Sequence, residues 1–96
     1  MSLYKKNNLS KLRKKLDALD EKLLVILKKR VNLVNQVLKN KKYKNQIVDK
    51  KRIKEIHKTI RKKSLKNKID PDLTKRVWKS MIKGFIEYEY KNFKKK

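Results

Sequence analysis

Hydrophobic residues recur at alternating steps of three and four residues along the first forty positions of the chain. They form an apolar seam that consists of Leu9, Leu12, Leu16, Leu19, Leu23, Ile26, Leu33 and Val37. This spacing predicts one long amphipathic helix, with Asn8 or Ser10 as its N-cap. No Gly or Pro interrupts the pattern before Lys42, and Arg30 stands where an apolar residue is expected.

The rest of the chain predicts two further helices. Residues 43–48 lose the pattern and are expected to form a loop. Asp49 is a candidate N-cap for a helix over residues 49–66, and a turn follows it. Asp70 and Pro71 combine a capping carboxylate with a proline at the first helical position, so they predict a third helix that ends near residue 93. The predicted fold class is therefore all-α, with one long, one short and one medium helix.

The length of the first helix has a consequence for assembly. At about 1.5 Å per residue, roughly 33 residues span ~50 Å, which is longer than a compact domain of 96 residues is wide. Such a helix cannot bury its seam against its own chain alone. We therefore expect residues 1–96 to form a single domain, frayed at 1–8 and 94–96, within an intertwined homodimer.

Composition excludes several classes of protein. The chain has no Cys, one Gly and one Pro, which argues against a disulfide scaffold, a Cys-based zinc site and a glycine-rich phosphate loop. No Ser stands in a Ser/His/Asp constellation, and we expect neither a cofactor nor a metal. Without a run of 18 apolar residues or a signal-peptide core, a soluble, cytoplasmic protein with no membrane segment is expected.

The charge balance is strongly basic and has two interpretations. With 32 Lys and Arg against 9 Asp and Glu, the net charge is +23, which is typical of nucleic-acid binders. The alternative is compositional drift towards Lys, since only five of the basic residues are Arg. Under such drift, we hypothesise that some of the five Arg residues mark positions that need the planar guanidinium fork, and that up to two of them are accidental.

Some cations stand on apolar faces. Arg30 and Lys41 lie on one face of the first predicted helix, and a buried cation requires an anion nearby. One interpretation is a pocket between helices that receives an anionic small molecule, with Arg13 and Arg52 converging on it. The alternative is that Arg30 pairs with an acid of a partner chain or extends its head group to solvent.

Three groups of residues resemble the all-helical, type II chorismate mutases. The first runs from Leu12-Arg13 through Leu16-Asp17, Leu19-Asp20 and Leu23-Leu24 to Arg30 and Lys41. The second is Asp49-Lys50-Lys51-Arg52, and the third is Trp78, Ile82 and Glu89. The resemblance covers residues 9–93. It implies an intertwined homodimer with shared active sites, in which chorismate rearranges to prephenate as a step of aromatic amino acid biosynthesis.

The resemblance also implies roles for individual residues. Arg13 would reach the partner's pocket, and Arg30 and Arg52 would complete the grip on the two substrate carboxylates. Lys41 would bind the ether oxygen and a carboxylate, while Asp49 would hold the hydroxyl end. Glu89 would face the ether oxygen, where a protonated carboxyl donates a hydrogen bond and an ionised one repels the developing charge. Turnover should then rise as the pH falls.

Two positions depart from the mutase pattern. Ile53 stands where mutases place a Glu, and Phe85 stands where many have a small Ser. Both departures resemble the related isochorismate-pyruvate lyases, which share the fold and form salicylate and pyruvate. We predict a chorismate mutase with Phe85 in the substrate pocket, and keep the lyase as the alternative. A basic helical nucleic-acid-binding protein is a further alternative, although no nucleic-acid motif accompanies the charge.

Overall fold

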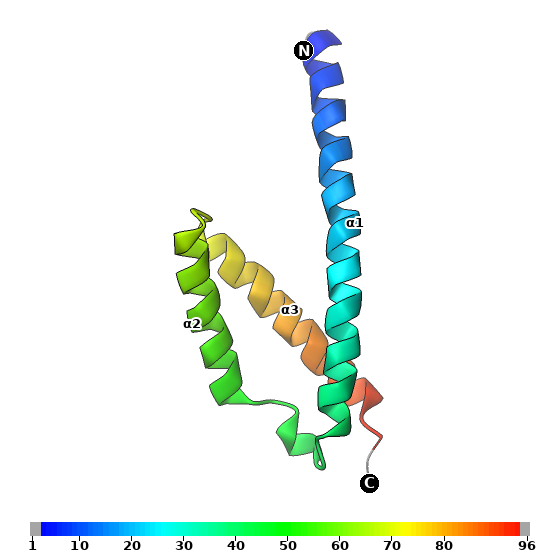
Figure 1. Cartoon of the computed structure of the whole chain (residues 1–96), viewed down its shortest axis with the longest axis vertical. Coiled ribbons are helices and arrows are strands. Elements are labelled where there is room, and N and C mark those ends of the chain that lie inside the picture. The colour runs from blue at the N-terminus through cyan, green and yellow to red at the C-terminus, as the bar shows by residue number, and fades with distance from the viewer. Residues whose placement is uncertain (1–2, 95–96) are drawn as a thin grey trace. The chain divides into compact units, whose positions relative to one another are not determined.

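The computed structural model describes residues 3–94, and these form three α-helices without a β-strand. Helix α1 covers Leu3–Lys39, α2 covers Lys50–Lys66, and α3 covers Pro71–Asn92 (Figure 1). A single turn of 3-10 helix, η1, covers Lys44–Gln46 inside the expected loop. The prediction of an all-α fold with one long, one short and one medium helix is confirmed.

The limits of α1 differ from the sequence prediction. The helix begins at Leu3 rather than at Asn8 or Ser10, so residues 3–8, expected to fray, are helical. Lys, Asn and Tyr have no strong helix-breaking effect, and the local pattern held no signal that would reveal the earlier start. At the other end the helix stops at Lys39. There the amides of Asn40 and Lys41 donate to the carbonyls of Val37 and Leu38 at 3.0 and 3.1 Å.

The contacts within the chain divide it into two units, and the first of them ends at Leu33. Between Leu3 and Leu33 this unit is a single helix, so it contains no second element against which to bury an apolar face. Its seam is correspondingly exposed: the exposed fractions of Leu12, Leu16, Leu19, Leu23 and Ile26 lie between 48% and 59%. The N-terminal unit therefore has no hydrophobic core of its own.

The second unit begins at Val34 and contains the end of α1, η1, α2 and α3. Helices α2 and α3 pack against each other, and the buried apolar side chains are Leu38, Ile47 and Ile82. The predicted N-caps of α2 and α3 are confirmed, whereas Asn8 and Ser10 lie inside α1 and do not cap it. The Asp49 carboxylate accepts from the amide of Arg52 at 3.0 Å, and the Asp70 carboxylate accepts from Asp72 at 2.9 Å. Within residues 3–94, no helix is both long enough and apolar enough to cross a bilayer.

Candidate functional site

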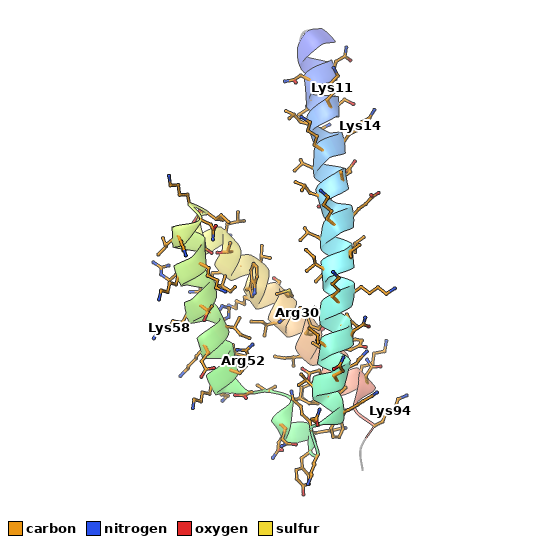
Figure 2. The ribbon with its side chains drawn as sticks, viewed as in Figure 1. Lys11, Lys14, Arg30, Arg52, Lys58 and Lys94 are labelled. Carbon is orange, nitrogen blue, oxygen red and sulfur yellow. The ribbon has the colours of Figure 1, made fainter. Side chains whose placement is uncertain are left out.

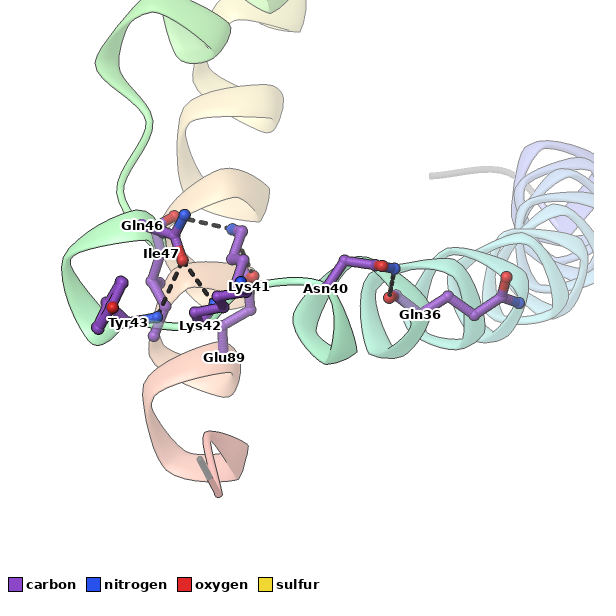
Figure 3. Close-up of polar contacts among 8 residues, drawn as sticks. All are labelled: Gln36, Asn40, Lys41, Lys42, Tyr43, Gln46, Ile47 and Glu89. Atoms are coloured by element: carbon purple, nitrogen blue, oxygen red, sulfur yellow. Dashed lines mark hydrogen bonds and ion pairs between the residues drawn. The ribbon is translucent and has the colours of Figure 1, made fainter. Parts of the chain in front are cut away.

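A part-buried ion pair joins the loop that follows α1 to α3. The ammonium of Lys41 lies 2.9 Å from Oε1 of Glu89, 48 residues later in the chain (Figure 3). The two side chains are only 18% and 10% exposed, so water screens the attraction weakly. The Lys41 ammonium also donates to the carbonyl of Ile47 at 3.3 Å. The structure thus brings together two residues that the sequence analysis had assigned to the substrate.

The loop that carries Lys41 is closed by its own hydrogen bonds. The side-chain oxygen of Gln46 accepts from the backbone amides of Lys42 and Tyr43 at 2.6 and 2.9 Å (Figure 3). Ile47, one residue further on, is only 3% exposed and anchors the loop in the core of the C-terminal unit. These contacts fix the backbone that follows Lys41. The sequence analysis did not identify Gln46, and no local pattern distinguishes it from other polar loop residues.

Asp49 and Arg52 lie together at the start of α2. The Asp49 carboxylate is occupied by the backbone amide of Arg52, so its contact within the chain is that of a helix cap. Both side chains are exposed, and the Arg52 guanidinium extends from the first turn of α2 (Figure 2). Ile53, the residue after Arg52, is half-buried.

Phe85 and Glu89 are four residues apart on α3 and therefore share one side of the helix. The half-buried Phe85 ring meets the ring of Tyr88 edge to face, with 6.5 Å between their centres. The Tyr88 hydroxyl in turn donates to the side-chain oxygen of Asn35 on α1 at 2.8 Å. This polar contact between α1 and α3 was not expected from the sequence.

The remaining two predicted site residues, Arg13 and Arg30, lie on α1 in the N-terminal unit. Arg13 is exposed and Arg30 is half-buried, although every seam residue from Leu12 to Ile26 is exposed. Within the C-terminal unit the structure therefore brings Lys41 and Glu89 into contact, and it places Asp49 beside Arg52 and Phe85 one turn from Glu89.

The chemistry that these groups offer is electrostatic. A protonated lysine has three N–H donors, and Glu89 and Ile47 occupy two of those of Lys41. One donor is therefore available to an oxygen atom of a ligand, and the ammonium is already oriented by its two protein partners. In the part of the chain that the structure describes, no three His, Asp or Glu side chains are grouped so as to hold a metal ion.

Comparison with known proteins identifies the family. No curated protein and no solved structure matches the chain. The family model described as chorismate mutase type II matches residues 12–90, which include the Lys41–Glu89 pair, all of α2 and most of α3. A match over most of the chain, on an all-helical fold, shows that this protein belongs to the type II chorismate mutase family.

Proposed function

We propose that the protein is a chorismate mutase that rearranges chorismate to prephenate. The observation that carries this proposal is the buried contact between Lys41 and Glu89, in which the lysine keeps one donor for a ligand. Membership of the family supports chorismate as the substrate. In this function the protein would act in the cytoplasm, in the shikimate pathway that leads to aromatic amino acids.

A pericyclic rearrangement needs neither a nucleophile nor a proton transfer. Its barrier falls when the substrate is held in a compact, reactive conformation and when charge that develops at the breaking C–O bond is stabilised. In the proposed mechanism, Arg30 and Arg52 bind the two carboxylates and Lys41 donates to the ether oxygen. Glu89 orients Lys41, and in its protonated form it donates a second hydrogen bond to the same oxygen.

Arg13 has a distinct place in this proposal, since it would enter the pocket of a second chain. The exposed seam of α1 supports such a homodimer, because single exposed leucines are ordinary but a continuous apolar stripe is not. A helix of 37 residues spans ~55 Å, which is long enough to contact a partner chain along several turns. Two identical sites would then be shared between the chains.

Isochorismate-pyruvate lyase activity is a second candidate, favoured by one observation. Ile53 is half-buried directly after Arg52, where the mutase pattern would place a Glu for the substrate hydroxyl. An apolar side chain there offers no hydrogen bond to that hydroxyl. In the proposed mutase, Asp49 would bind the substrate hydroxyl in place of that Glu.

The decisive experiment gives the purified protein chorismate and isochorismate in separate reactions. Formation of prephenate from chorismate supports the mutase, whereas salicylate and pyruvate from isochorismate support the lyase. Arg30→Ala should abolish either activity, while Arg76→Ala, an exposed position on α3, should leave it unchanged. If neither substrate is consumed and the protein retains nucleic acid through purification in high salt, the nucleic-acid alternative gains support and the mutase proposal is rejected.

A further inference from the structure

A cavity lined mainly by basic residues lies between α2 and α3, apart from the candidate site. It has a volume of about 210 Å³ and is lined by His57, Lys58, Ile60, Arg61, Pro71 and Lys75. None of these residues belongs to the candidate site built around Lys41 and Glu89. The sequence analysis assigned His57 no role, and the structure shows it half-buried at this cavity.

The lining is unusual in its charge. Four of the six lining residues are basic and none is acidic. Among residues 3–94, none of the four has a hydrogen bond or an ion pair through its side chain. On α2, Lys58 precedes Arg61 by three residues, and like charges at that spacing repel one another. Lys75 adds a further positive charge from α3, so an anion in the cavity would relieve this repulsion.

The scaffold around the cavity is held in place by hydrogen bonds. The hydroxyls of Ser64 on α2 and Thr74 on α3 lie 2.7 Å apart, and Ser64 is only 4% exposed. The amide of Ile69 also donates to the carbonyl of Ser64 at 2.9 Å, which closes the turn between the helices. Thr74 directly precedes Lys75, so this contact fixes the backbone that carries one of the cations. A site on two joined helices is better ordered than one on loops.

We propose that this cavity binds a phosphate group, either free or carried as a monoester on a small molecule. A terminal phosphate carries a charge near −2 and three acceptor oxygens, which suits a cavity lined by several cations better than a single carboxylate does. The guanidinium of Arg61 matches phosphate with two parallel N–H donors. The volume lies below the range of pockets for larger organic ligands, and Ile60 and Pro71 supply apolar walls. This proposal is independent of the mutase activity.

The test is a titration of the full-length protein with inorganic phosphate, followed by NMR at constant pH, with chloride adjusted to keep the ionic strength constant. The ring signals of His57 and the amide signals of Ile60 and Lys75 should shift and saturate. The double variant Arg61→Gln/Lys75→Gln should bind phosphate at least tenfold more weakly. The matched control is Lys62→Gln/Arg76→Gln, which removes the same two residue types, one from each helix, at exposed positions outside the cavity.

Each outcome decides the proposal. A loss of phosphate affinity in the cavity variant alone supports the proposal. An equal loss in the cavity and control variants would mean that phosphate binding depends only on the net charge, and this result would overturn the proposal. Ribose 5-phosphate and a short oligothymidine distinguish the sources of phosphate. Binding of the oligonucleotide without binding of phosphate or ribose 5-phosphate would overturn the proposal in favour of a nucleic-acid backbone contact. Circular dichroism checks that both variants remain helical, and Lys75→Gln alone repeats the test with one substitution.

Discussion

Glu89 connects the structural and the catalytic roles of the candidate site. Glu89 is a buried residue of α3, and its carboxylate lies 2.9 Å from the Lys41 ammonium. In the structure the partner is the lysine that the resemblance assigned to the ether oxygen. Substitutions at either residue therefore test the protein contact and the chemistry separately.

Glu89→Gln is the variant that tests the chemistry. An ionised Glu89 carboxylate repels the negative charge that develops at the ether oxygen, whereas a side-chain amide donates a hydrogen bond to that oxygen. Glutamine can accept from Lys41 and still donate through its amide nitrogen, so Glu89→Gln should retain at least the kcat of the unaltered protein in steady-state kinetics at neutral pH. A loss of kcat of about tenfold or more would contradict the assignment. Glu87→Gln, at an exposed position on the same helix, is the control.

Lys41→Met tests the ion pair as a structural contact. The substitution leaves the Glu89 carboxylate, only 10% exposed, without its cation, so the free energy of unfolding should fall by about 3 kcal/mol. Urea denaturation measures this loss. The double variant Lys41→Met/Glu89→Leu removes both charges and should recover more than half of it. Equal losses in the single and double variants would contradict the prediction that the unpaired Glu89 carboxylate causes the loss. The exposed neighbour Lys42→Met should have little effect.

Arg30→Lys tests the proposed bidentate grip on a carboxylate. Lysine keeps the charge but loses the planar pair of donors, so kcat/KM for chorismate should fall at least tenfold, equivalent to ~1.4 kcal/mol. Steady-state kinetics measures the change, with Arg76→Lys as a silent control at an exposed position. Equal activity of Arg30→Lys and the unaltered protein would refute the role.

At the scale of the elements, Asp49 has two roles that can be separated. Its carboxylate caps α2 through the amide of Arg52, and the proposed mechanism also uses it to hold the substrate hydroxyl. Asp49→Ala should lower the free energy of unfolding by about 1 kcal/mol, whereas Asp49→Asn retains a good cap and should leave stability nearly unchanged. A higher KM for Asp49→Asn at unchanged stability would support the substrate role. Thermal denaturation and steady-state kinetics, applied to both variants, make this distinction.

At the scale of the whole molecule, the exposed seam of α1 predicts self-association. Light scattering should give twice the chain mass of 11.7 kDa. Leu16→Asn/Leu23→Asn replaces two seam residues that are 58% and 55% exposed, and it should convert the dimer to a monomer and abolish activity. Lys14→Asn/Lys28→Asn, on the opposite side of the helix, should leave the mass unchanged. A fully helical, active protein with the mass of one chain would reject the shared site.

The sequence alone determined the helical elements and most of their ends. Three helices follow from local spacing, and the caps Asp49 and Asp70 were recognisable because a carboxylate acts within one turn of its own position. The early start of α1 at Leu3 escaped prediction, since it rests on weak propensities without a cap signal. The family resemblance could also be stated from the sequence, because residue types at fixed spacings carry it.

Only the tertiary structure decided which charges meet. No acidic residue stands near Lys41 in the sequence except beyond the following loop, and its partner Glu89 lies 48 residues away. The same is true of the Tyr88–Asn35 hydrogen bond and of the basic residues of α2 and α3 that line one cavity. Helix periodicity fixes the side of a helix on which a residue lies, but not the residue of another helix that it faces. That choice depends on how the turns and the packed core set the helices against each other.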